Sequence, residues 1–470
     1  MAFDTIKINS GTIRQQKLQD VMMPKKYNMP HTNMTLTPDT IFARSTQWQA
    51  WLDVEAALAR VQSDIGMIPS WAAAKITAAA QLDVIGYDAL VDDIARTMAP
   101  VLSLTRLLGN AAGDAGDYVH WGATTQNVMQ TGRILLMRQA DSAIRKQLAL
   151  AARILGKLAD DEANTMMIGR TNRQNALPIT FGFKVASWIT ELDRTEARMS
   201  DAARRLFVLP FGGAIGAMQS FGDQGRELNK RLAAELELAE MLLPGRAIND
   251  VFAEYLVQLS MLGMFIERVM TEAYTLIGQD YGELGERLDD GAIGSSTMPQ
   301  KVNPKYVIPV AAQATQLRGY AVTALETGRI SHEGDPLSNQ ILYAVLDQAV
   351  PLAWRACSGF AEALSRLTVN RDVMAQKLAS AGTSVCAENL MMTLAPLVGR
   401  GRAHDIVHHA LETGGPDALF TDVNITNHLS ESQIKTALDP SHYLGDSVEI
   451  AHRAATLAED IATRLQVRTN

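Results

Sequence analysis

The residues best suited to chemistry lie in one short loop, Gly294 to Pro304, which reads GSSTMPQKVNP. Glycine, two serines, two prolines and one lysine within eleven residues are typical of an ordered loop, not of a helix or a strand. A long segment with helical apolar periodicity follows. Hydroxyl and backbone N–H groups beside a lysine, leading into a helix N-terminus, are suited to binding an anion. The loop is therefore predicted to bind an anion.

Two further polar segments precede long helical patterns. The first, Tyr118 to Asn127, is a run of hydroxyl and amide groups, in which Thr124 or Thr125 is a candidate N-cap. The residues alone leave helix capping and ligand binding as alternatives. The second, Gly169 to Pro178, holds two arginines beside amides, which either bind a carboxylate or cap the C-terminus of a neighbouring helix.

Long helices are expected to position these segments. The apolar pattern between about 130 and 370 predicts helices over 135–163, 177–207, 249–277, 306–325 and 337–367. Helices of this length favour a bundle. The 249–277 segment carries a stripe of Phe252, Leu256, Leu259, Leu262, Phe265 and Ile266, with further apolar residues beside it. The width of this stripe predicts neighbours from other subunits, and hence a helical homo-oligomer. The alternative is a monomer with a large five-helix core.

Length and glycine and proline punctuation divide the chain further. A chain of 470 residues is longer than a single hydrophobic core usually supports, which indicates several domains. Its 47% hydrophobic residues are enough to bury a large core. We predict an N-terminal helical domain over 1–118, a central long-helix domain over 119–370 and a small C-terminal helical domain over 371–470. Because residues 1 to about 40 contain three prolines, we expect them to form an extended arm or a loop.

Charge and cysteine content exclude several functions. A formal net charge of −8 argues against nucleic-acid or anionic-membrane binding. The two cysteines, Cys357 and Cys386, lie in apolar helical patterns and are expected to be buried thiols in a reducing compartment. A polar N-terminus and the lack of a membrane-length apolar run predict a cytoplasmic protein. Because no glycine-rich nucleotide loop follows a strand, we expect no cofactor and no metal.

The order and spacing of the three segments resemble the three signature regions of the fumarase/aspartase superfamily. Phe211–Gly216, Asn249–Glu254 and His332–Asp335 are similar to that family as well. The chain most resembles the branch that holds adenylosuccinate lyase and 3-carboxy-cis,cis-muconate cycloisomerase, including its tail, Glu388 to His404. The resemblance implies an all-α, three-domain homotetramer whose central helices form a twenty-helix bundle. Each active site would then combine the three regions from three subunits and bind a small (di)carboxylate.

The resemblance also implies roles for individual residues. Ser295 would be the base, with its alkoxide stabilised by loop N–H groups and Lys301. Lys301 and Asn303 would hold the carboxylate that becomes an aci-carboxylate dianion, and Gly291 and Gly294 would let the loop close over substrate. His120 would be a third catalytic residue. The other substrate-binding residues would be Thr124, Thr125, Asn127, Thr171, Asn172, Gln174, Ser296 and Met298.

Several positions depart from the adenylosuccinate lyase pattern. Where that enzyme has a histidine that assists the leaving group, this chain has Asn172, which cannot donate a proton near neutral pH. The 102–108 segment lacks a further family histidine, and Glu333–Gly334 stands where the family has Glu-Arg. These departures argue against purine-nucleotide chemistry. Thr125, Asn127 and Gln130 replace Ser and Asp residues common to both groups of the branch, which predicts altered substrate contacts.

Three functional hypotheses follow. The first is a lyase that eliminates an amine-type or other leaving group from a succinyl-type acid, giving fumarate or a related unsaturated acid. The second is a cycloisomerase that adds an internal carboxylate across a muconate double bond to form a lactone. The third is a non-catalytic helical oligomer. The identity of the general acid, His120 or His332, stays open at this stage.

Overall fold

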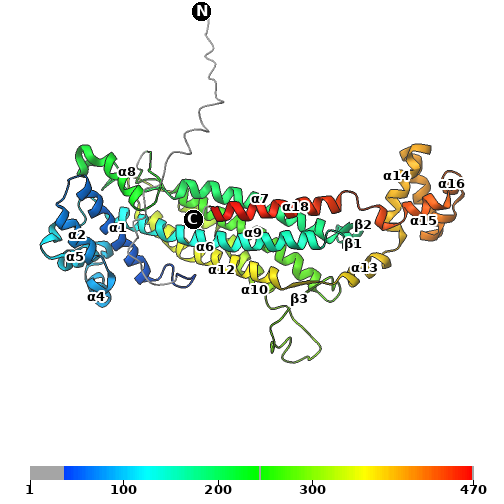
Figure 1. Cartoon of the computed structure of the whole chain (residues 1–470), viewed down its shortest axis with the longest axis horizontal. Coiled ribbons are helices and arrows are strands. Elements are labelled where there is room, and N and C mark those ends of the chain that lie inside the picture. The colour runs from blue at the N-terminus through cyan, green and yellow to red at the C-terminus, as the bar shows by residue number, and fades with distance from the viewer. Residues whose placement is uncertain (1–35, 243–244, 468–470) are drawn as a thin grey trace, which may run out of the picture. The chain divides into compact units, whose positions relative to one another are not determined.

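The structure is a computed structural model, and it describes residues 36–242 and 245–467. The arm predicted for residues 1 to about 40 lies, up to residue 35, outside these described residues. In the described part, helices dominate and four short strands form two antiparallel pairs (Figure 1). The mostly helical fold class is confirmed, whereas the domain boundaries, the twenty-helix bundle and the tetramer stay predictions.

Short helices make up the first part of the described chain. They are α1 (Arg44–Asp64), α2 (Ser70–Ala79), α3 (Leu82–Ile85), α4 (Tyr87–Thr97) and α5 (Pro100–Ala112), followed by a 3₁₀ turn over Gly113–Tyr118. Glycine and proline set several of their ends. Gly86 adopts φ 84° between α3 and α4, and Pro100 occupies the first turn of α5, where its missing N–H costs nothing. Helix α1 is buried along most of its length and packs on α2, α6 and α8 (Gly225–Glu235).

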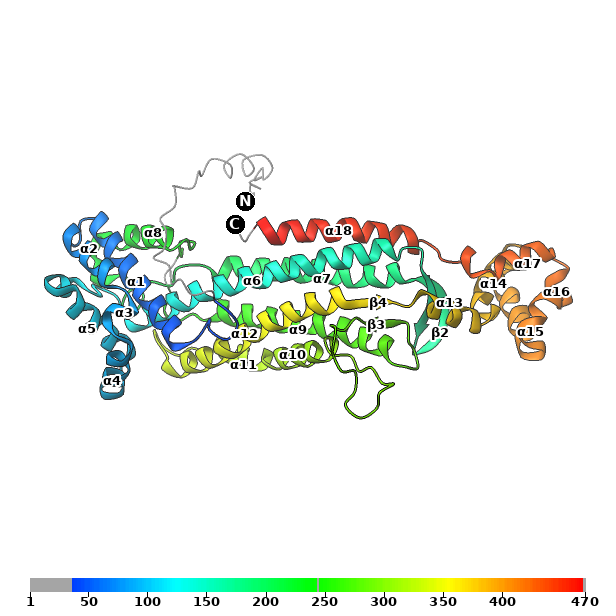
Figure 2. The same cartoon turned by 60° about the horizontal axis from the view of Figure 1, so that its bottom comes forward.

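Long helices run side by side through the centre of the molecule (Figures 1 and 2). They are α6 (Thr125–Asp161), α7 (Phe181–Leu206), α9 (Asp250–Ile277), α12 (Pro336–Arg366) and α18 (Ser447–Val467). Two shorter helices, α10 (Val307–Gly319) and α11 (Ala321–Glu326), pack on α9 and α12. The predicted helices over 249–277 and 337–367 match α9 and α12 to within a residue. The single helix predicted over 306–325 is wrong, because the chain breaks after Gly319, a residue of low helix propensity.

Regular spacing of buried residues explains the length of α6. Its buried positions include Ile134, Met137, Asp141, Ile144, Leu148, Ala151 and Leu155, at alternating steps of three and four. This is the pattern of a helix packed in a bundle. Helix α18 lies along α6 and α7, and a Cβ at Gly156 would meet the Cβ of Ala458 at 2.8 Å, so glycine allows this close approach.

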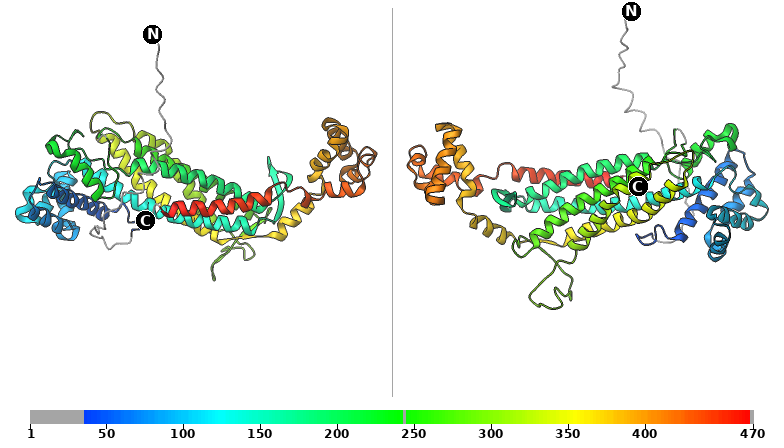
Figure 3. Two further views of the ribbon diagram at one scale, coloured as in Figure 1. Left: turned by 45° about the horizontal axis from the view of Figure 1, so that its top comes forward. Right: turned by 180° about the vertical axis from the view of Figure 1, so that it is seen from behind.

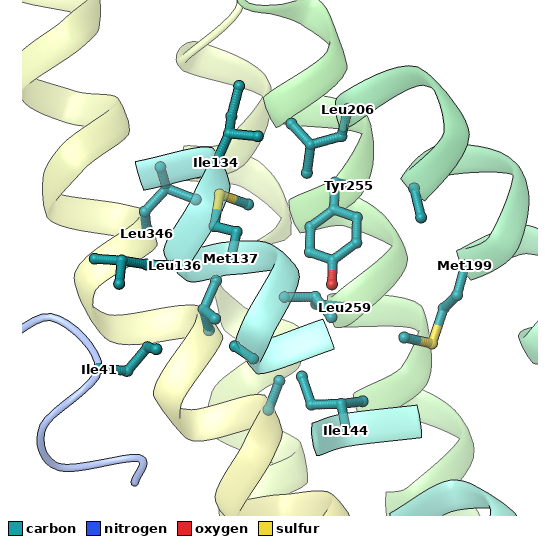
Figure 4. Close-up of a cluster of buried hydrophobic side chains, with 14 of the residues drawn as sticks. Ile41, Ile134, Leu136, Met137, Ile144, Met199, Leu206, Tyr255, Leu259 and Leu346 are labelled. Atoms are coloured by element: carbon teal, nitrogen blue, oxygen red, sulfur yellow. The ribbon is translucent and has the colours of Figure 1, made fainter. Parts of the chain in front are cut away.

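The apolar stripe of α9 is covered within the chain itself. Its six residues, from Phe252 to Ile266, are at most 2% exposed, and α9 packs on α7, α10, α11 and α12. Figure 4 shows Leu259 and Tyr255 of this helix among side chains of α6, α7 and α12. The inference that this stripe needs other subunits to bury it is therefore wrong, and any case for an oligomer has to rest on the site.

A short hairpin replaces the loop predicted before the 177–207 helix. Strands β1 (Met166–Thr171) and β2 (Gln174–Thr180) pair antiparallel, with Thr171 opposite Gln174. The turn residues Asn172 and Arg173 have φ of 48° and 63°, as a two-residue hairpin turn with the favoured twist requires. The hairpin lies at the end of α6 that is far from the short N-terminal helices (Figure 2).

A second hydrophobic cluster forms in the C-terminal part. Its helices are α13 (Arg371–Ser380), α14 (Ala387–Val398), α15 (Arg400–Thr421), α16 (Val423–Thr426) and α17 (Glu431–Ala437) (Figure 3). Strands β3 (Leu284–Glu286) and β4 (Leu367–Val369) pair ahead of them. Cys357 and Cys386 are buried free thiols, as predicted. Among the described residues, no helix is both long and apolar enough to cross a membrane.

Candidate active site

The loop that contains Ser295 is fixed to the helical body at both of its ends. Before it, the Glu286 carboxylate accepts backbone N–H groups of Tyr306 (3.1 Å) and Val307 (2.8 Å), which caps the start of α10. Asp289 accepts from the Tyr306 hydroxyl (2.8 Å) and from Arg366 (2.7 Å). The Arg366 bond, followed by the Tyr306 bond, holds the pKa of Asp289 below its ordinary value. Residues 290–304 extend from these ends as an irregular loop (Figure 2).

Inside the loop, Ser295 sits in a turn that points backbone donors at its oxygen. Its Oγ accepts the N–H of Met298 at 3.2 Å and that of Thr297 at 3.4 Å. The Asn303 N–H donates to the Gly294 carbonyl at 3.3 Å and closes the loop. A Cβ at residue 294 would lie 2.7 Å from a backbone oxygen, so this closure requires glycine. Donors aimed at Oγ favour its alkoxide over its neutral form.

Most of the other loop residues predicted for the site are exposed to solvent. Ser296, Met298 and Lys301 are exposed, and Asn303 is half-buried. Ile293 and Val302, both apolar, are 71% and 66% exposed. A loop that exposes apolar side chains beside a lysine and serines is suited to packing against a further surface or a ligand.

The first region forms the start of α6. Thr124 is the N-cap residue, and its backbone N–H donates to Asn127 Oδ1 at 3.3 Å. Asn127 also accepts the Gly213 N–H (3.1 Å) and donates to the Pro210 carbonyl (3.2 Å), so its amide holds the 210–213 segment in place. Asn127 is buried and occupied by these bonds, whereas Thr125 is exposed and available to a ligand. Thr124 and Asn127 are thus engaged in capping, and Thr125 stays the candidate for ligand binding.

A buried carboxylate pairs with the histidine of this region. His120 Nδ1 lies 2.6 Å from Glu55 Oε1 of α1, and the Glu55 side chain is 1% exposed. Burial acts to lower the pKa of His120, but the charge and hydrogen bond of Glu55 outweigh it and raise the pKa above 6.5. His332, the other candidate general acid, is exposed ahead of α12. The geometry therefore favours His120, whose position next to a carboxylate suits a proton-transfer group.

Replacing Glu55 by Gln should make the stability of the protein depend less on the charge of His120. A raised folded-state pKa stabilises the protein fully below about pH 6.5, and this stabilisation disappears as pH rises through the folded pKa. We expect Glu55→Gln to lose about 1 to 3 kcal/mol at pH 6 and less at pH 9, because a hydrogen bond to a charged group contributes about this much. Thermal unfolding of both proteins from pH 5 to 9 measures the difference. A deficit that grows with pH would contradict the pairing.

Beside the first region lies a cluster of amides and one arginine. Gln130, Asn249 and Asn339 are buried and hydrogen-bonded to one another at 3.0 to 3.3 Å. They join α6, the start of α9 and the start of α12. Arg246, just before α9, donates from Nη1 to Thr124 Oγ1 at 3.3 Å. The 211–216 and 332–335 segments, noted in the sequence, converge on the same place through Ala214 and Gly334.

The second region occupies the hairpin tip. Thr171, Asn172, Arg173 and Gln174 are all exposed there. Arg170 is not available to a substrate, because both its terminal nitrogens bind the buried carboxylate of Glu283, one of them at 2.8 Å. This ion pair fixes the hairpin to the segment before β3. Of the two alternatives given for the arginines of this segment, Arg170 binds a carboxylate, but it is that of Glu283 in the same chain.

One chain does not bring the three regions together. The first and second regions lie at opposite ends of α6, whose 37 residues span about 55 Å. The first region and the base of the loop lie at opposite ends of α9, which spans about 42 Å with its 28 residues. Half of the 290–304 loop, even fully extended, reaches only about 25 Å. A site that combines the first region with Ser295 therefore needs a second copy of the chain.

Fold and site together define a class of protein. Residues 20–319 match the sequence model of the family described as Lyase, and the chain belongs to this family and to the fumarase/aspartase superfamily. It is an enzyme of that superfamily.

Individual relatives sharpen the comparison. The chain is 30% identical over 84% of its length to N-acetyl-S-(2-succino)cysteine lyase of Enterococcus italicus, covering 88% of that protein. It is 31% identical over 88% of its length to 3-carboxy-cis,cis-muconate cycloisomerase of Pseudomonas aeruginosa, covering 92% of it. The structure of the 3-carboxy-cis,cis-muconate lactonizing enzyme from Pseudomonas putida superimposes with a TM-score of 0.82 at 28% identity, over 90% of this chain and 97% of that one.

Proposed function

We propose that this protein is a homotetrameric lyase that eliminates a leaving group from a 2-substituted succinate and releases fumarate or a related unsaturated acid. The observation that carries the proposal is the Ser295 turn, in which two backbone N–H groups point at Oγ. Such donors lower the energy of an alkoxide, the form of serine that can act as a base. Membership of the lyase family supports the reaction class.

Proton abstraction is the first half of the proposed reaction. Ser295 removes the proton from the carbon next to one carboxylate, and the electron pair moves into that carboxylate as an aci-carboxylate dianion. Lys301 and Asn303, which lie on the same loop as the base, stabilise this extra charge. Hydrogen-bond donors and positive charge lower the energy of the dianion as it forms. Thr125, supplied by another subunit, binds the substrate from the start of α6. Met298 and Ser296 line the loop side of the substrate.

Expulsion of the leaving group is the second half, and Asn172 restricts its chemistry. The dianion collapses to a carbon–carbon double bond, and the bonding pair departs with the leaving atom. An amine needs a proton to leave, whereas a thiolate, whose conjugate thiol has a pKa of about 8.5, leaves without one. The hairpin tip offers the amide of Asn172 and no general acid, so it suits a sulfur leaving group better than an amine. We therefore propose a thioether of succinate as the substrate class, consistent with the S-(2-succino) relative.

Cycloisomerisation is the second candidate. It rests on the likeness to 3-carboxy-cis,cis-muconate cycloisomerase and to the solved lactonizing enzyme. It would use the same serine and loop. Incubation with fumarate plus thiols or amines, and separately with 3-carboxymuconate, with absorbance of the unsaturated acids followed in the ultraviolet, separates the two. Consumption of 3-carboxymuconate without any change in fumarate would overturn the lyase proposal.

Asn172→His tests the role of the hairpin tip. Histidine tolerates the left-handed turn conformation of this residue and adds a proton donor. Donors of this kind accelerate catalysis by about 10²- to 10⁴-fold when well placed, and an amine gains from one while a thiolate does not. The ratio of kcat/KM for an amine adduct of fumarate to that for a thiol adduct should rise at least about tenfold. An unchanged ratio would show that residue 172 does not face the leaving group.

A further inference from the structure

Arg246 is an arginine without an acidic partner beside the first region. Arg133 and Arg145, which are buried, and Arg170, which is half-buried, each pair with a carboxylate, namely Asp347, Asp141 and Glu283. Arg246 instead touches only neutral groups among the described residues: Nη1 donates to the Ala214 carbonyl and to Thr124 Oγ1, at 3.3 Å for the latter. Its Nε is buried without a hydrogen-bond partner.

The unused edge of this guanidinium faces a glycine. A Cβ placed on Gly334 would lie 2.6 Å from Nε, 2.9 Å from Nη2 and 3.1 Å from Cζ. These distances put Gly334 directly against the Nε–Nη2 edge, so a side chain at residue 334 would collide with the guanidinium. Gly334 does not have a positive φ, so backbone conformation does not demand glycine there. Its lack of a side chain gives the guanidinium room to lie there, and Nη2, which has no hydrogen-bond partner among the described residues, is the donor left for an anion.

Burial makes the unpaired charge costly. Burial lowers the pKa of Arg246, and its charge is favoured only by Tyr343, with no carboxylate acting on it. Two acids flank Gly334 in sequence. Asp335 already accepts from Ser331 and from the Leu337 N–H at 2.9 Å at the start of α12, and Glu333 is exposed and makes no ion pair with Arg246 in the described structure. A guanidinium held in this way stabilises an anion brought from outside the chain.

We infer that Arg246 binds a carboxylate of the substrate beside Thr124 and thereby selects dianionic over monoanionic substrates, with Gly334 giving the guanidinium room to lie there. This inference rests on the proposed function, since it assigns a carboxylate of that substrate to a residue. Arg246 binds and orients the substrate, and the proton transfers belong to other groups. Thr124, held by Arg246 Nη1, is fixed by the same contact.

Calorimetric titration with succinate and with its monoamide tests the inference in the full-length protein. Charge-assisted hydrogen bonding predicts that Arg246→Gln weakens succinate binding about 10- to 100-fold and removes the preference for succinate over the monoamide. Gly334→Ala, which keeps the charge and crowds the guanidinium, should weaken succinate binding about tenfold. Arg246→Lys should recover part of the affinity, and Arg402→Gln, a control on the exposed face of α15, should bind as the wild type does.

Two outcomes overturn the assignment. One is an Arg246→Gln protein that binds succinate with wild-type affinity. The other is a variant in which succinate and the monoamide weaken equally, which marks a structural role. Because binding is read without turnover, the result is independent of the reaction. A wild type that eliminates from succinyl thioethers while Arg246→Gln binds normally would remove only this inference and leave the proposed function standing.

Discussion

Ser295→Ala should reduce kcat by at least about a thousandfold, because both the base and the acceptor of the loop donors disappear with one oxygen atom. The change should leave folding intact. Ser295 Oγ accepts only two local backbone bonds in a loop whose ends are fixed by Glu286 and Asp289. Steady-state kinetics on a succinyl thioether, with thermal unfolding beside them, measure the effect.

A matched serine provides the control for this substitution. Ser380, at the exposed end of α13, bonds only to the Lys377 carbonyl, so Ser380→Ala should keep wild-type kinetics and stability. Succinate binding by Ser295→Ala should persist. Undiminished turnover in the Ser295 variant would assign the base to another residue, and His120 would then be the first to test.

Mixing two inactive variants should restore activity. Thr125→Asp places a negative charge where the substrate carboxylate binds, at a helix start that accepts an acidic residue. Ser295→Ala removes the base. Because α9 separates the first region from the loop within one chain, the proposed site takes these parts from different copies, and randomly mixed oligomers should recover about a quarter of wild-type activity.

The mixing experiment has a clear contrary result. The two variants are refolded or expressed together, and activity is compared with each alone and with each mixed with wild type. If the mixture shows no more than the sum of the separate variants, each chain holds its own complete site. That outcome would mean that the loop moves much farther than its length and anchors indicate.

Much of the fold was predictable because the long helices repeat their apolar residues over many turns. Periodicity placed α9 and α12 within a residue of their ends. It could not show that α9 is covered by its own chain, since the width of a stripe does not identify the helices that cover it. The hairpin was not predicted, because the polar residues around Asn172 and Arg173 are typical of a loop. The tight turn depends on the positive φ of these two residues, which their types do not indicate.

The site residues divide in the same way. The resemblance to the superfamily's signature regions led to the prediction of Ser295, Thr124 and His120 as site residues. No local signal predicted Glu55, which is 65 residues from His120 in sequence, or Arg246, which is 122 from Thr124. The proposed role of each of these two side chains depends on a contact with a residue on another element. The departure at Gly334 was visible in the sequence, but its consequence appears only where the guanidinium lies against it.

Addition in heavy water tests the central claim most directly. The protein is incubated with fumarate and a thiol in D₂O, and the adduct is analysed by mass spectrometry and proton NMR. Proton delivery by Ser295, whose hydroxyl exchanges with solvent, predicts one deuteron on the carbon next to a carboxylate, in a single configuration, and no enzymatic adduct with Ser295→Ala. An adduct without deuterium, or an equal mixture of configurations formed no faster than without protein, would contradict a Ser295-based lyase.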